Sequence, residues 1–116
     1  MSERAGAAAT FVLAGLTLLV MAWRGATGRL RRNPFFGLRT GATMSSDEAW
    51  EVAHRVAARP TAYAGAASIA GGLLAAVAGG NPTALVVIGG VTSVAIVTPA
   101  LLGAARGDRA ARHLRD

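Results

Sequence analysis

The sequence predicts an all-α membrane protein with three transmembrane helices and a short interfacial helix in the first cytoplasmic loop. Charged residues make up only 16% of the 116 residues, whereas soluble domains carry about 25%. Three stretches, 5–23, 61–80 and 82–105, contain no charged residue. The arginines gather in the loop after the first stretch and in the tail after the third. At this length we expect a single domain over residues 1–116.

The first predicted span, 5–23, is long enough to cross a bilayer. At a rise of about 1.5 Å per residue it extends about 28 Å, close to the hydrocarbon thickness of about 30 Å. A cleaved signal peptide is the alternative interpretation of this segment. The length of the apolar run and the lack of a small-x-small cleavage site before Arg24 favour a retained span.

The second predicted span, 61–80, has the weakest apolar character, because its residues are mostly Ala and Gly. A buried helix of a soluble domain is the alternative. We favour a span because the segment is long and uncharged, and because the third span follows after a very short turn. Gly79 and Gly80 are suited to end one helix, Asn81 to cap the next and Pro82 to occupy its first position. The two spans should therefore form an antiparallel hairpin.

Small residues recur every fourth position in the second span. Such rows let helix backbones approach closely in a membrane, so we expect this helix to lie centrally, against the other two or against a second copy. The two rows are Gly71, Ala75, Gly79 and Ser68, Gly72, Ala76, Gly80. In the third span, Pro99 should free the carbonyl of Ala95 and bend the helix, with Thr98 or Ser93 able to compensate.

The arginine distribution predicts the orientation. Eleven of the twelve basic residues lie in the loop or the tail, which share one side of a three-span protein, and only Arg4 precedes the first span. The positive-inside rule therefore predicts a multi-pass plasma-membrane protein with its N-terminus outside and its C-terminus in the cytoplasm. The arginines are not interleaved with stacking aromatic residues, so we expect anionic lipid headgroups as partners and no nucleic acid. Those of the tail are Arg106, Arg109, Arg112 and Arg115.

The loop between the first two spans predicts a short interfacial helix over about 45–58. Ser45 followed by Glu48 matches a capping box, and Pro60 should end the helix. The i, i+3, i+4, i+7 spacing places one set of residues on a single face, with Trp50 at headgroup depth: Trp50, Ala53, His54 and Ala57. Glu51 and Arg55 are spaced to form an i, i+4 ion pair. Phe35 and Phe36 are further candidates for insertion into the membrane.

The same loop contains an ordered motif of eight residues: Asn33, Gly37, Arg39, Thr40, Thr43, Trp50, His54 and Arg55. With this motif the chain resembles the SdpI family, which is named for the membrane immunity protein of the sporulation-delaying toxin system. The resemblance extends over roughly residues 10 to 105. It implies an immunity or signalling membrane protein that confers resistance to a membrane-active peptide toxin or tethers a cytoplasmic regulator. The alternative is a structural subunit of a membrane complex without a ligand of its own, and a second copy of the chain is a further candidate partner. The eight residues that carry the resemblance also form the candidate binding motif.

Two interpretations of this motif stay open at the level of sequence. Arg39 offers five donors and a permanent charge, so it is suited to hold a lipid phosphate, a carboxylate such as Asp47 or Glu48, or helix carbonyls. The motif is then either a binding site for a peptide or lipid, or a staple that folds the loop onto the helices. No carboxylate pair, nucleophile triad or metal-ligand spacing occurs in the sequence. We therefore expect no enzymatic activity, no cofactor and no metal.

Overall fold

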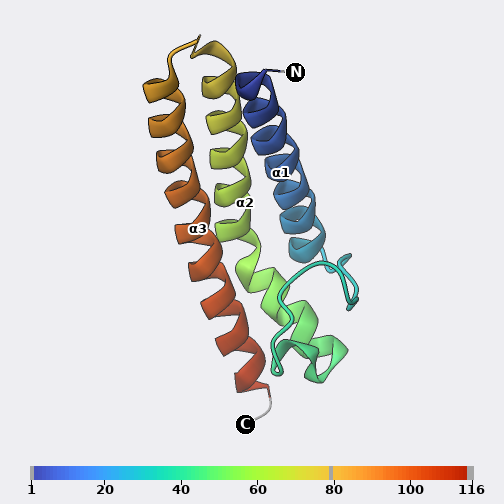
Figure 1. The fold of residues 1–116 in the computed structure, drawn as a ribbon. Helices are drawn as coiled ribbons and strands as arrows, with labels where there is room; N and C mark the ends of the chain where they lie inside the picture. Colours follow the sequence, from blue (N-terminus) through green and yellow to red (C-terminus); the bar gives the residue numbers. More distant parts are fainter. Residues whose placement is uncertain (1, 79, 115–116) are drawn as a thin grey trace.

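The computed structural model describes residues 2–78 and 80–114, and these residues fold into a bundle of three long helices (Figure 1). Helix α1 covers Glu3–Ala26, α2 covers Asp47–Val77 and α3 covers Pro82–His113, and a single 3-10 turn, η1, covers Thr43–Ser45. All three long helices are long and apolar enough to cross a membrane. The predicted all-α, three-span fold is therefore confirmed. Gly79 and the tail residues Arg115 and Asp116, to which parts of the sequence predictions apply, lie outside the described residues.

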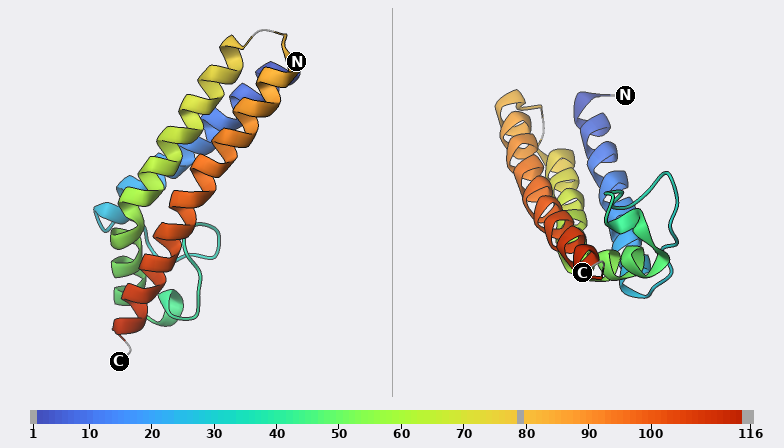
Figure 2. Two further views of the ribbon diagram at one scale, coloured as in Figure 1. Left: turned by 90° about the vertical axis from the view of Figure 1, so that its left-hand side faces the viewer. Right: turned by 90° about the horizontal axis from the view of Figure 1, so that it is seen from below.

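Helix α2 is the centre of the bundle, as the rows of small residues predict. It contacts α1 on one side and α3 on the other, and the view from below places it between them (Figure 2). The N-terminus lies at the same end as the turn between α2 and α3, while the C-terminus and the loop after α1 lie at the opposite end (Figure 1).

Gly71 of the first small-residue row faces α3, and Ser68 and Gly72 of the second row face α1. A Cβ atom added to Gly72 would lie 2.8 Å from Cγ2 of Val12 in α1. The hydroxyl of Ser68, which is fully buried, donates a hydrogen bond of 2.6 Å to the carbonyl of Phe11. A Cβ atom added to Gly71 would instead collide with the side chain of Thr92 in α3. Small residues on two faces of one helix thus allow two backbones to approach it closely.

The contacts of the second row end before the helix does. Ala76 and Gly80 are exposed, and a Cβ atom added to Gly80 would meet no atom within 4 Å.

The predicted N-cap of the loop helix is wrong by one residue, and the helix begins at Asp47. Ser46, rather than Ser45, caps α2, because its side chain accepts a hydrogen bond from the amide of Ala49 at 3.0 Å. Ser45 belongs to the preceding 3-10 turn, where its hydroxyl donates to the carbonyl of Ala42 at 2.6 Å. Two adjacent serines made the sequence compatible with either cap.

The prediction that Pro60 ends a separate interfacial helix is also wrong. Pro60 lies inside α2, which continues without interruption to Val77, and the ribbon changes direction in the lower half of this helix (Figure 1). A proline removes one backbone hydrogen bond of a helix and crowds the preceding turn, and here tertiary packing offsets that cost. Pro60 is buried, and a Cβ atom added to Gly103 of α3 would lie 3.0 Å from its Cβ atom.

Residues 47–60 of α2 lie before the predicted second span, 61–80. The whole helix has 31 residues and is about 46 Å long, whereas the hydrocarbon layer is about 30 Å thick. Every charged side chain of α2 lies before Pro60: Asp47, Glu48, Glu51, Arg55 and Arg59. We therefore describe residues 61–77 as the membrane-spanning part of α2 and residues 47–59 as an extension outside the hydrocarbon.

The start of α3 is capped as predicted, whereas α2 ends at Val77 with Ala78 as its C-cap, before the glycines that the sequence suggests for this role. The side-chain oxygen of Asn81 accepts hydrogen bonds from the amides of Thr83 and Ala84 at 3.0 and 3.2 Å, and Pro82 is the first residue of α3.

Pro99 lies inside α3, which continues past the predicted end of the third span. The hydroxyl of Ser93 donates to the carbonyl of Gly89 at 2.7 Å, so Ser93 does not compensate for the freed carbonyl of Ala95.

Candidate functional site

The chain reverses direction immediately after α1. The carbonyl of Arg24 accepts hydrogen bonds from the amides of Arg29 and Leu30 at 2.7 and 3.1 Å. Gly28 supplies the positive φ of 72° that this reversal needs. The indole nitrogen of Trp50 then donates to the carbonyl of Leu30 at 2.8 Å. A tryptophan of the sequence motif thus connects the start of the loop to α2.

His54 connects the middle of the loop to α2. Its Nε2 atom accepts a hydrogen bond of 2.8 Å from the amide of Leu38. A backbone amide can only donate, so Nε2 carries no proton, and the proton of the neutral ring lies on Nδ1. Nδ1 accordingly donates to the carbonyl of Trp50 at 2.8 Å. Both ring nitrogens are therefore used to hold the backbone.

Gly37 lets the loop backbone pass over the two rings. Its φ of 100° lies in the region that favours glycine. A Cβ atom at this position would collide with Nε2 of His54 and lie 3.0 Å from the indole of Trp50. The two rings are 4.2 Å apart between centroids. The motif thus brings Gly37, Trp50 and His54 together, because the loop backbone passes close to two adjacent rings that are tilted by 33° to each other.

The environment of His54 favours its neutral form. Burial lowers the pKa of His54 below the ordinary value of 6.5, and the hydrogen bond to the Trp50 carbonyl opposes this effect. A protonated ring would point its Nε2 proton at the amide proton of Leu38. The hydrogen bonds and the pKa direction agree that His54 holds the loop as a neutral ring.

Two threonines connect the loop to α3. The hydroxyl of Thr43, a fully buried residue, accepts from the amide of Thr40 at 2.9 Å and donates to the carbonyl of Leu38 at 2.7 Å. The hydroxyl of Thr40 donates to Oδ1 of Asp108 at 2.5 Å. Asp108 in turn pairs with Arg112, one helical turn later, at 2.7 Å. Loop, η1 and α3 are thereby joined through side chains.

The remaining motif residues make local contacts. The side-chain oxygen of Asn33 accepts from the amides of Phe35 and Phe36 at 2.9 and 2.8 Å, which forms a tight turn. The guanidinium of Arg39 is exposed and donates through Nη1 to the carbonyl of Pro34.

Arg55 pairs with Glu51 at 2.8 Å, as its spacing predicts. This ion pair lies beside Gly28, at the end of α1. The structure therefore does not bring Arg55 into the contacts around His54.

Comparison with protein families gives an assignment for this arrangement. The model of the SdpI/YfhL protein family matches residues 29–103, more than half of the chain. The chain belongs to the SdpI/YfhL family. The match begins in the loop after α1 and includes the whole of α2 and most of α3. Neither a curated protein nor a solved structure matches the chain.

Trp50 of the SdpI motif is not the membrane anchor that the sequence predicts. Only 1% of this residue is exposed, because its ring packs under Gly37 and beside His54. Phe35 and Phe36, by contrast, are 80% and 53% exposed, and their insertion into the membrane stays a prediction.

Two residues that the sequence motif omits hold the SdpI loop in place. Asp108 accepts from Thr40, and its signal in the sequence is a single acid within α3 that stands four positions before Arg112. Arg32 donates to the carbonyl of Met44 at 2.9 Å and pairs with Asp47 at 3.3 Å. Asp47, a predicted partner of Arg39, thus pairs with Arg32 instead.

Proposed function

We propose that this SdpI-type membrane protein protects its cell against a membrane-active peptide toxin. The observation that carries the proposal is the family match over residues 29–103, which includes all eight residues of the loop motif. The contacts within the loop support a division of labour among its residues. Trp50, His54 and Thr43 direct their polar groups inward, whereas Phe35, Phe36 and Arg39 lie on the exposed side of the loop.

The exposed side of the loop combines apolar and cationic groups, which suits a peptide that enters the membrane. Arg39 uses one of its five N–H groups on the Pro34 carbonyl, so other donors of the fork face outward for a carboxylate or a phosphate. Phe35 and Phe36, which directly follow Pro34, supply exposed apolar surface. The arginine asymmetry supports placing this loop and the tail at the cytoplasmic side.

Survival of a sensitive host is the test of this proposal. Cells that express the wild type, Arg39→Lys or Arg109→Lys are exposed to a panel of membrane-active peptides. Arg109→Lys is the matched control, because Arg109 is exposed on α3 and outside the motif. Lysine keeps the charge but loses the planar fork. We expect protection by the wild type and by Arg109→Lys, and reduced protection by Arg39→Lys.

Membrane abundance of each variant is measured in parallel, because a variant that fails to fold disappears from the membrane. Reduced protection at normal abundance supports Arg39 as a ligand of the peptide. Equal protection by all three proteins removes Arg39 from the proposed site. A wild type that protects against none of the peptides contradicts the immunity proposal and favours a structural subunit.

A further inference from the structure

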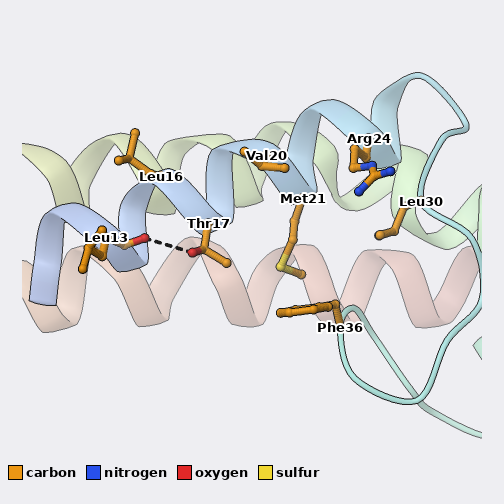
Figure 3. A pocket seen from close by; sticks show the side chains of 8 residues that line it. All are labelled: Leu13, Leu16, Thr17, Val20, Met21, Arg24, Leu30 and Phe36. Carbon is orange, nitrogen blue, oxygen red and sulfur yellow. Dashed lines mark hydrogen bonds between the residues drawn. The ribbon is translucent and has the colours of Figure 1, made fainter.

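An apolar groove runs along the outer face of α1 at the loop end of the bundle (Figure 3). Its volume is about 340 Å³. Its floor consists of α1 side chains, and two loop residues, Leu30 and Phe36, close it from the side of the loop. Figure 3 shows Phe36 extending beneath Met21, with Arg24 and Leu30 at one end of the groove and Leu13 at the other. The α1 residues are Leu13, Leu16, Thr17, Val20, Met21 and Arg24.

Apart from Arg24 at its end, the floor of the groove presents no free polar group to an occupant. Thr17 is its one hydroxyl-bearing residue, and that hydroxyl donates to the carbonyl of Leu13 at 2.9 Å (Figure 3). Leu13, Leu16 and Val20 are 63%, 48% and 54% exposed. Such a floor favours contact with a hydrocarbon chain.

A positively charged side chain, Arg24, lies at the loop end of the groove. The guanidinium of Arg24 makes no hydrogen bond or ion pair with any other part of residues 2–78 and 80–114. Leu13 and Arg24 are separated by about 17 Å along the helix, at a rise of about 1.5 Å per residue. This distance is close to half of the hydrocarbon layer, which is about 30 Å thick. The groove is therefore as deep as one leaflet, with its charge at the level of the headgroups.

We propose that this groove binds one anionic phospholipid, with an acyl chain along α1 and the phosphate on Arg24. The loop motif builds the site: the turn at Asn33 directs Phe36 over the groove, and the reversal after Arg24 returns Leu30 to its end. An arginine fork forms charge-assisted hydrogen bonds with phosphate oxygens. A neutral peptide helix or a second copy would leave this cation without a partner, so the charge favours a lipid.

Native mass spectrometry of the detergent-purified protein tests the site with dioleoyl phosphatidylglycerol and dioleoyl phosphatidylcholine as probes. We expect one tightly retained phosphatidylglycerol, and we expect Arg24→Gln to weaken its retention about fivefold, the equivalent of about 1 kcal/mol per surface arginine. Arg59→Gln is the matched control, because Arg59 is an exposed arginine near the membrane boundary that does not line the groove. Phe36→Ala should weaken retention of both lipids, since it opens the side of the groove.

Three results overturn the proposal. If Arg24→Gln and Arg59→Gln lose phosphatidylglycerol retention equally, then lipid binding depends on the overall charge of the protein and not on this groove. Unchanged retention in both Arg24→Gln and Phe36→Ala places the lipid elsewhere on the protein. A dimer without bound phosphatidylglycerol assigns the face of α1 to a second copy. Thermal unfolding of Arg24→Gln and Phe36→Ala confirms that each variant is folded before its lipid retention is compared.

Discussion

Replacing His54 with alanine removes the connection between the middle of the loop and α2. The amide of Leu38 loses its acceptor, and the carbonyl of Trp50 loses the donor on the His54 ring while keeping its helical partner. A buried backbone group without a partner costs about 1–3 kcal/mol. Truncating a large buried side chain costs about 3–5 kcal/mol for Phe or Trp, and less for the smaller imidazole. Because this part of the protein lies outside the hydrocarbon and water can reach freed groups, we expect a total loss of about 2–4 kcal/mol.

Two measurements check this loss in detergent micelles. Denaturant unfolding should give a lower free energy of unfolding for His54→Ala, and trypsin should cleave more rapidly after Arg39 once the loop is released. His113→Ala is the matched control, because His113 is exposed at the end of α3. Surface substitutions usually change the free energy of unfolding by no more than about 0.5 kcal/mol. A change of this size in His54→Ala, together with an unchanged cleavage rate, would refute the role assigned to His54.

The same histidine predicts how stability depends on pH. Burial lowers the pKa of His54 in the folded state below 6.5, so between the two values the unfolded chain binds more protons than the folded chain. Stability then rises with pH in this range. We expect the free energy of unfolding of the wild type to fall as the pH is lowered below about 6.5, and we expect His54→Gln to lack this component. An identical pH dependence of the two proteins would contradict the neutral, doubly bonded ring.

Three further predictions follow from packing and topology. Gly72→Leu should lower the free energy of unfolding by about 1–3 kcal/mol, because an added Cβ lies 2.8 Å from a side chain of α1, whereas Gly90→Leu, which meets no atom within 4 Å, should not; equal melting temperatures would argue against the close packing. Asp108→Ala should cost about 1–2 kcal/mol by removing a hydrogen-bond acceptor from the loop, and unfolding that matches the wild type would contradict that contact. Reporter fusions after Ala42 and at the C-terminus should report cytoplasm, and one after Gly80 should report the outside; a cytoplasmic signal at Gly80 would rule out three spans.

The helices were predictable because their signals are local. Uncharged runs of bilayer length predict the spans, and the Asn81-Pro82 pair predicts the start of α3 from the chemistry of a single turn. The central position of α2 was predictable as well, since small residues such as Gly71 and Gly72 occur on two of its faces. The course of α2 through Pro60 was not, because the packing that offsets the proline comes from Gly103, far away in the sequence.

The motif was predictable as a set of residues, but its contacts were not. Tryptophan is a residue type that is enriched at membrane interfaces. Trp50 nevertheless lies inside the protein, because a loop glycine passes over its ring. The partner of Thr40 is Asp108, 68 residues later, and no spacing rule connects the two. The hydrogen bonds of His54 were not predictable, because the sequence does not show which loop amide lies beside its ring. Contacts between residues that lie far apart in the sequence depend on tertiary folding, which a local pattern does not encode.

The central claim about the site is that the loop packs against α3. A pair of introduced cysteines tests this contact most directly. The chain contains no cysteine, so Thr40→Cys with Asp108→Cys introduces two unique thiols in place of side chains whose oxygens lie 2.5 Å apart. After mild oxidation of native membranes, thiol labelling of the denatured protein counts the thiols that remain. We predict that this pair forms a disulfide and loses labelling, while Thr40→Cys with Leu101→Cys, at an exposed site on α3, keeps both thiols. Equal labelling of the two pairs would contradict the docked loop.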